Sequence, residues 1–196
     1  MVQELLAEAG IALADCDAIA FGAGPGSFTG VRTACGIAQG LAFGAGLPVL
    51  PLVTLAAMAL ACHQETGATE ILAVLDARMG EVYWAQYRYA NGAWQTVAEP
   101  ALCAPADVAP AASAQPLTAC GNGFAAYADA FAASTFGAAA VVGIMPHAAQ
   151  IAQLARTAFS AGAAVSAAEA QPIYLRNKIA FTSAERKLIN AAKAAA

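Results

Sequence analysis

Positive charge is scarce in this chain. Only 9 of its 196 residues are lysine or arginine, against 13 aspartate and glutamate residues, and the formal net charge is −4. The first lysine is Lys178. A face that binds nucleic acid neutralises many phosphates with clustered cations. The composition therefore predicts that the chain on its own does not bind nucleic acid directly.

Paired cysteine motifs and long apolar runs are also absent. No two of the five cysteines form a C-x-x-C pair, and all stand among apolar residues, which favours reduced, buried thiols over disulfides or a zinc site. No positively charged start leads into an apolar run, and Gly and Pro interrupt the apolar stretches before they reach membrane-spanning length. These absences predict a soluble, cytoplasmic protein without a metal site or a membrane partner. The five cysteines are Cys16, Cys35, Cys62, Cys103 and Cys120.

What is present is an apolar, alanine-rich chain. Hydrophobic residues make up 60% of the sequence and charged residues 11%, which excludes intrinsic disorder. Alanine buries little area per side chain, so we expect a core built by close approach of backbones as much as by large side chains.

The first part of the sequence has the pattern of a βαβ unit. An apolar helical stripe covers Met1–Ala9, a buried strand is predicted over Ala18–Ala23, a helix over Phe28–Phe43 and a second strand over Pro48–Val53. Thr54 is in position to cap a further helix. We assign residues 1–69 to a first lobe with βαβα order, which lacks the opening strands that a complete lobe of this kind has.

The second part opens with strand-like alternation from Ile71 to Val97, with turn signals at Met79-Gly80 and Asn91-Gly92. A strand, a helix, a strand and an amphipathic helix are then expected over 117–121, 122–132, 139–143 and 147–160. We assign residues 70–182 to a second lobe, and 183–196 to a helical or frayed tail.

The stretch "FGAGPGSFTG" joins the first predicted strand to its helix and raises the question of a phosphate site or a catalytic turn. A P-loop needs a lysine that this stretch does not have, and in a G-x-G-x-x-G fingerprint the third glycine would fall on Ser27. A nucleophile elbow, G-x-S-x-G, would need glycines where Pro25 and Thr29 stand, so a peptidase that uses Ser27 is a third-rank hypothesis. Two interpretations stay open: an anion site on backbone N–H groups at Gly24, Gly26 and Ser27, or a structural turn.

The helix after this turn has glycines on one face. At 3.6 residues per turn, Gly36, Gly40 and Gly44 align with Thr33, while the opposite side is apolar and the polar seam is narrow. Each helical glycine costs about 1 kcal/mol relative to alanine. We therefore expect another helix to pack close to these glycines, either within the chain or from a partner subunit.

Four separated blocks, "GPGSFTGVR", "GIAQGLAFG", "VLDARMGEVYWAQY" and "PIYLRN", resemble the bacterial TsaB family, also called YeaZ. The resemblance implies the α/β, actin-like and sugar-kinase-like ATPase fold of two RNase H-like lobes, here with the first lobe N-terminally truncated. The family normally begins with about one meander of additional chain. We therefore expect exposed strand edge and apolar surface in the first lobe, and poor solubility or obligate association.

The resemblance also implies a function. Family members act as the non-catalytic subunit of the system that adds a threonylcarbamoyl group to the adenosine beside the anticodon in tRNAs reading codons that begin with adenine. They bind and activate TsaD, the transferase, work with the ATPase TsaE, and form homodimers without TsaD. No cofactor is required, although ATP or ADP with magnesium is a candidate near the interface. The implied partner surface consists of Leu5, Leu6, Arg32, Thr33, Gly36, Ile37, Gly40 and Gly44.

Two charged residues have open roles. Asp76 ends an apolar strand and is a candidate for a metal-bound phosphate, or else forms a turn-stabilising pair with Arg78. Arg176 either binds an anion or a partner carboxylate, or forms a salt bridge that ties the C-terminal segment to the first lobe. The alternative function is an ATP-dependent phosphotransferase or ATPase of the same fold, which would depend on Asp76. His63 and His147 are interpreted as structural.

Overall fold

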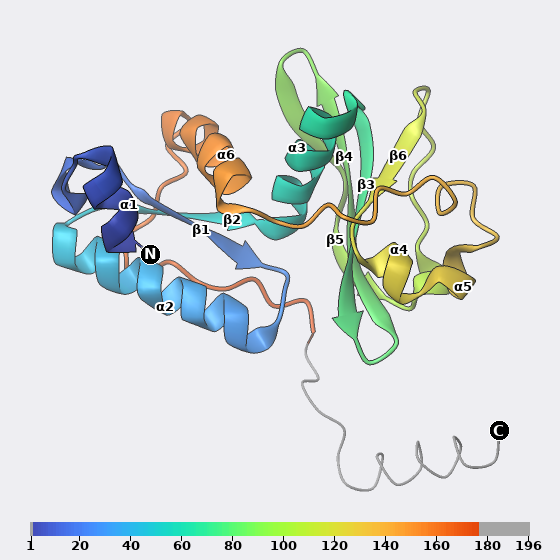
Figure 1. Ribbon diagram of the computed structural model, residues 1–196, viewed down its shortest axis with the longest axis horizontal. Helices are drawn as coiled ribbons and strands as arrows, with labels where there is room; N and C mark the ends of the chain where they lie inside the picture. The colour runs from blue at the N-terminus through green and yellow to red at the C-terminus, as the bar shows by residue number, and fades with distance from the viewer. Residues whose placement is uncertain (1, 177–196) are drawn as a thin grey trace, which may run out of the picture.

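A two-stranded parallel sheet and a four-stranded mixed sheet organise the computed structural model, which describes residues 2–176 (Figure 1). The first lobe contains the two-stranded sheet, β1-β2, and the second lobe the sheet with strand order β5-β4-β3-β6. The strands are β1 (Ile19–Gly24), β2 (Val49–Val53), β3 (Glu70–Arg78), β4 (Glu81–Ala90), β5 (Ala93–Cys103) and β6 (Leu117–Cys120).

The predicted βαβ unit is confirmed. Helix α2 (Phe28–Ala45) connects β1 to β2, and the two strands pair in parallel. Ser27 caps the helix N-terminus by accepting the N–H of Gly30, and Gly46 ends it in the left-handed conformation. Apolar residues at helical spacing on α2 pack against the sheet. The core of this lobe includes Cys35, Ala38 and Ala42 from α2, together with Phe21, Val49 and Ala170.

Helix α6 (Ala148–Ser160) lies on the opposite face of the first sheet from α2, although it follows the second lobe in the sequence (Figure 1). The chain after α6 stays with this lobe, because Val165 exchanges two backbone hydrogen bonds with Val49 and Ile173 donates one to Ala23. Packing therefore does not follow the expected division at residues 70–182. Residues from α6 to Ile173 pack with the first lobe instead.

The second lobe is built around β3, which is buried on both faces. Ile71, Ala73 and Leu75 face helix α3 (Thr54–Thr66), while Leu72 and Val74 belong to a separate core on the other face. The period-2 alternation of a strand accounts for this division. The second core also takes Phe124 and Phe131 from two short helices, α4 (Gly123–Ala126) and α5 (Ala128–Phe131).

Both predicted turn signals are confirmed. Met79 and Gly80 connect β3 to β4, and Asn91 and Gly92 connect β4 to β5; all four have positive φ. Asparagine and glycine tolerate this conformation better than other residues do.

Three parts of the second lobe differ from expectation. Residues 139–143 form no strand, and only an isolated bridge joins Val141 to Cys120. The single helix expected over 122–132 is broken into α4 and α5 at Tyr127, whose backbone leaves the helical region. The tail at 183–196 lies outside the described residues. The remaining elements are α1 (Val2–Ala9) and two 3-10 turns, η1 (Leu13–Asp15) and η2 (Pro105–Asp107).

Candidate functional site

The glycine turn after β1 packs against the C-terminal part of the described chain. Gly24 has a φ of 123°, and a Cβ placed on it would lie 2.7 Å from the carbonyl oxygen of Ile173. The Gly24-Pro25 peptide is cis, and the Pro25 carbonyl accepts a hydrogen bond from the Thr54 hydroxyl. Close approach of another segment therefore explains why glycine occupies position 24, which is the structural interpretation of the motif.

Ser27 acts as a helix cap. Its Oγ accepts the N–H of Gly30 at 3.1 Å, and no described contact joins it to a histidine. His63 lies elsewhere, with Nδ1 2.8 Å from the carbonyl oxygen of Ala68, and His147 precedes α6. Among the described residues, neither histidine is placed to activate Ser27 as a nucleophile.

A small cleft of about 200 Å³ lies where the two lobes meet. Gly26 and Ser27 line it from the first lobe and Arg78 from the second. Gly24 and Asp76 do not line it, so the structure brings together only part of the candidate nucleotide site. Pockets for small-molecule ligands usually measure about 300–1,000 Å³, so this cleft alone is too small to enclose a nucleotide.

Asp76 is occupied by structural contacts. Its Oδ1 accepts the backbone N–H of Arg78 at 2.8 Å and the hydroxyl of Tyr127 at 3.0 Å, while its Oδ2 lies 3.2 Å from the Arg78 guanidinium. The Asn122 side chain accepts the Asp76 N–H. Burial, followed by the hydrogen bond to the Asp76 carboxylate and its negative charge, raises the pKa of Tyr127. Both Asp76 oxygens are thus engaged in shaping the β3-β4 turn.

Arg176 contacts the second lobe rather than the first. Its guanidinium pairs with the Glu81 carboxylate at 2.5 Å and donates to the carbonyl of Arg78 at 3.2 Å. Two residues earlier, Tyr174 accepts a hydrogen bond from Arg32 on α2 at 2.8 Å. The segment ending at Arg176 therefore contacts both lobes. Its ion pair is with the second lobe, whereas the sequence had predicted a salt bridge to the first lobe.

The outward face of α2 is small, apolar and uncovered. A Cβ added at Gly36, Gly40 or Gly44 would meet no described atom within 4 Å. Ile37 is 54% exposed and Phe43 is 85% exposed. Among residues 2–176, no other helix packs against the glycine face. This face is therefore open to a second molecule.

The other predicted interface residues lie on or near this face. Thr33 is exposed, and Arg32 is exposed with its guanidinium 3.7 Å from the centroid of the Phe28 ring. On α1, Leu5 is 61% exposed and Leu6 is half-buried. Phe43 was not among the predicted interface residues, although the predicted helix included it. Its position, three residues after Gly40, was the available signal.

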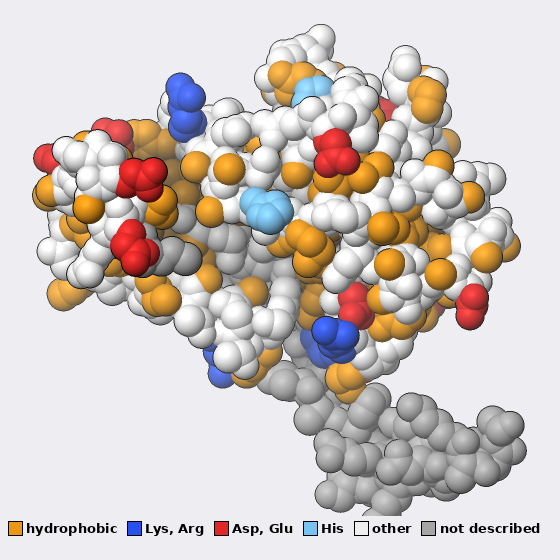
Figure 2. Space-filling view, viewed as in Figure 1, with side chains coloured by type: hydrophobic (Ala, Val, Ile, Leu, Met, Phe, Trp, Pro, Cys, Tyr) orange, Lys and Arg blue, Asp and Glu red, His pale blue; other side chains and the backbone are white. Residues whose placement is uncertain are grey.

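Charge does not gather into a basic surface. Figure 2 shows positive and negative side chains scattered over one face of the molecule. No group of three or more metal-ligating side chains occurs among the described residues. No helix between residues 2 and 176 has the length and apolarity to span a bilayer.

Together these features define a two-lobed mixed α/β protein with an uncovered small-residue helix face and, in the part of the chain described, no assembled catalytic centre. The chain belongs to the TsaB (YeaZ) family of tRNA threonylcarbamoyladenosine biosynthesis proteins. It is 42% identical to the TsaB protein of Escherichia coli over 92% of this chain and 80% of that protein. It is 39% identical to the TsaB protein of Haemophilus influenzae over 92% of this chain and 79% of that protein.

A family model described as TsaD, tRNA N6-adenosine threonylcarbamoyltransferase, also matches residues 1–193. Two solved structures from Pseudomonas aeruginosa resemble the fold. YeaZ has a TM-score of 0.82 and 40% identity, covering 89% of this chain and 82% of its own. A protein described as similar to peptidase YeaZ has a TM-score of 0.84 and 41% identity, covering 90% and 81%. The fold of this chain therefore resembles that of YeaZ structures, which belong to the actin-like class.

Proposed function

We propose that this chain is a non-catalytic scaffold subunit that binds and activates a TsaD-type transferase during threonylcarbamoyladenosine formation on tRNA. The observation that carries the proposal is the uncovered face of α2. Gly36, Gly40 and Gly44 leave its backbone accessible, while Ile37 and Phe43 offer apolar side chains beside them. A partner helix can approach such a face closely, with the exposed apolar residues as anchors.

The chemistry available in the chain supports a scaffold rather than an enzyme. Ser27 has no described base beside it, and both oxygens of Asp76 are engaged in the β3-β4 turn. The first lysine in the sequence is Lys178, so no lysine from the glycine turn can reach a phosphate. Transferase activity would then reside in the partner, and this chain would act by holding the partner in its active arrangement.

The cleft between the lobes does not fit a magnesium nucleotide by itself. The lobe cleft measures about 200 Å³, and the candidate carboxylate for a metal-bound phosphate, Asp76, is already bonded to Arg78 and Tyr127. ATP or ADP with magnesium would therefore need residues from the partner subunit. TsaE is proposed as a further partner of the assembled complex, and homodimers through the α2 face are expected when the transferase is absent.

The deciding experiment is co-purification of this chain with the TsaD homologue of the same genome. Gly40→Arg places a large charged side chain on the α2 face, whereas the matched Gly143→Arg variant changes an exposed glycine of the second lobe that also has open space around it. We expect Gly40→Arg to abolish co-purification and Gly143→Arg to retain it. Threonylcarbamoyladenosine in tRNA, quantified by nucleoside mass spectrometry, should decrease in parallel with binding.

Equal binding by both variants would exclude the α2 face as the docking surface. If the unmodified chain neither binds the transferase nor supports nucleoside formation with it, the scaffold function itself is wrong. Circular dichroism of each variant checks that a loss of binding does not come from unfolding.

A further inference from the structure

Two thiols meet in the core of the second lobe. Cys62 lies near the end of α3 and Cys120 is the last residue of β6, and both are fully buried in the same apolar core. Cys120 Sγ lies 4.0 Å from the carbonyl oxygen of Met58, four residues before Cys62. Residues four apart share one face of a helix, so this sulfur reaches the strip of α3 that carries Cys62. The two thiols form a hydrogen bond with each other there.

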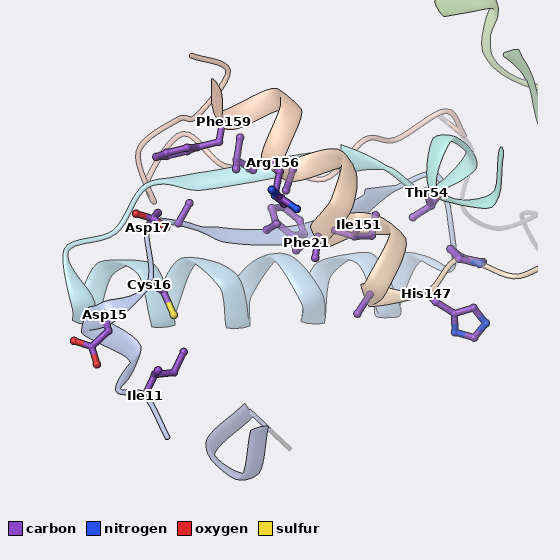
Figure 3. A pocket seen from close by; sticks show the side chains of 18 residues that line it. Ile11, Asp15, Cys16, Asp17, Phe21, Thr54, His147, Ile151, Arg156 and Phe159 are labelled. Carbon is purple, nitrogen blue, oxygen red and sulfur yellow. The ribbon is translucent and has the colours of Figure 1, made fainter. Parts of the chain in front are cut away.

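The other three cysteines contact no second thiol in the described chain. Cys35 is buried and donates to a backbone carbonyl at 3.4 Å. Cys103 is half-buried at the end of β5. Cys16 is half-buried at one end of a groove in the first lobe, as Figure 3 shows. A paired arrangement is therefore particular to Cys62 and Cys120.

The contact makes the two thiols chemically unequal. The hydrogen bond from Cys120 holds the pKa of the Cys62 thiol below its usual range, against the opposing effect of burial. The same hydrogen bond, together with burial, raises the pKa of Cys120 well above its usual range. Because the thiolate is the reactive form of cysteine, Cys62 is the nucleophile of the pair and Cys120 is the second, resolving thiol.

Both thiols lie close to the ends of their elements. Strand β6 has four residues, and it pairs with β3 on one side but has only an isolated bridge, from Cys120 to Val141, on the other. Helix α3 ends at Thr66, one turn after Cys62. Ends of elements open locally at a lower free energy than the whole fold does. A small oxidant can therefore reach the pair without unfolding of the chain.

We propose that Cys62 and Cys120 are a redox-sensitive pair that a peroxide converts into an intramolecular disulfide, which joins α3 to β6. The Cys62 thiolate attacks one oxygen of hydrogen peroxide, and the O–O bond breaks. Cys62 becomes a sulfenic acid, and the released hydroxide takes up the proton that Cys62 had lost, which forms water. Cys120 Sγ then attacks Cys62 Sγ, the S–O bond breaks, and the hydroxyl group leaves with the Cys120 proton as a second water. The two thiols lose two electrons in total, and one peroxide is reduced to two waters.

The disulfide would enclose residues 63–119, which include β3, β4 and β5. A cross-link around a long loop restricts the unfolded chain, so the oxidised protein should have a midpoint of thermal unfolding about 5–10 °C higher than the reduced protein. Neither thiol belongs to the α2 face. The proposal therefore stands or falls separately from the scaffold function.

Thiol counting tests the proposal. The full chain is incubated with hydrogen peroxide in slight excess, then denatured and alkylated, and the intact mass of the monomer is measured. The untreated protein has five free thiols, and the treated protein should have three, because the disulfide removes two. Reduction with dithiothreitol should restore all five.

Matched variants locate the bond. Cys62→Ala should abolish the loss of two thiols, and so should Cys120→Ala. Cys103→Ala changes a half-buried cysteine outside the pair and should retain the loss. Circular dichroism checks that each variant is folded. Fragment mapping of the oxidised unmodified chain identifies the linked segments without any substitution, and it should find the α3 segment joined to the β6 segment.

Three results would overturn the proposal. Oxidation of Cys16 or Cys103 with Cys62 and Cys120 still open to alkylation would show that the oxidant does not reach the pair. Sulfinic acid at Cys62 with a free Cys120 would show that the two sulfurs cannot close the bond. A disulfide that forms only in denaturing urea would belong to the unfolded chain and not to the fold.

Discussion

The carbonyl oxygen of Ile173 lies 2.7 Å from the position that a Cβ on Gly24 would take. The same two segments are joined by the hydrogen bond from Ile173 N–H to the carbonyl of Ala23. The glycine turn therefore packs directly against the segment that continues to Tyr174 and Arg176. That segment connects the two lobes. The glycine of the turn is required by packing between distant parts of the chain.

Gly24→Ala should destabilise the protein by about 2–4 kcal/mol, because alanine strains a φ of 123° and also meets a backbone oxygen. Urea unfolding measures the effect. Gly143→Ala is the control, since position 143 has ordinary φ and open space, and its free energy of unfolding should change by less than about 0.5 kcal/mol. Similar values for both variants would contradict the packing explanation.

Gly40→Ala should have opposite effects on stability and on binding. The glycine lies in α2 with no described atom near a new Cβ, so alanine should raise the free energy of unfolding of the isolated chain by about 0.5–1 kcal/mol. The same methyl group should weaken association with the transferase if a partner helix packs there. Thermal unfolding and a binding titration measure the two effects. A variant that is more stable and binds unchanged would show that the glycine serves no interface.

Tyr87 should make the protein sensitive to alkaline pH. Burial, and then the negative charge of Glu99, raise the pKa of its phenol in the folded state, and its hydroxyl has no described partner. An unfolded tyrosine ionises near pH 10. The stability that this group contributes is therefore fully present below about pH 10 and is lost above it, by about 1.4 kcal/mol per pH unit.

Tyr87→Phe should remove this loss and leave stability at neutral pH unchanged or slightly higher, because the buried hydroxyl forms no hydrogen bond with a described residue. Urea unfolding from pH 8 to about pH 11.5 measures it. Tyr89→Phe, at a half-buried position of the same strand, should keep the alkaline decrease. An identical decrease in the Tyr87→Phe protein would assign the effect to another group.

The ion pair between Glu70 and Arg88 joins β3 to β4 at a buried position. The Glu70 side chain is 2% exposed and that of Arg88 is 39% exposed. Arg88→Met should destabilise the protein by about 2–3 kcal/mol, because it leaves a buried carboxylate without its partner. The loss is smaller than for a fully buried ion pair because Arg88 is partly exposed to solvent. Combining it with Glu70→Met should recover part of that loss, as measured by a double-mutant cycle. Additive effects of the two substitutions would mean that the pair has no net coupling.

Local patterns were sufficient to predict the first strand, its helix and the second strand. Ser27 and Gly46 define the ends of α2 through contacts with their own neighbours, and Asn91-Gly92 defines a hairpin in the same way. Such signals act over a few residues, so they can be recognised without the fold. The pattern failed at 139–143, where apolar residues without a paired strand form only one bridge.

The sequence by itself determined the βαβ order of the first lobe, the hairpin turns of the second lobe, the glycine face of α2 and the family. Only the tertiary structure decided that α6 covers the first sheet, that Ile173 occupies the space above Gly24, and that Arg176 pairs with Glu81 on the second lobe. It also decided that the glycine face remains open within the described chain. The periodicity of helices and strands is local, so the spacing of apolar residues along the sequence shows it. Contacts between segments far apart in sequence depend instead on how whole elements pack.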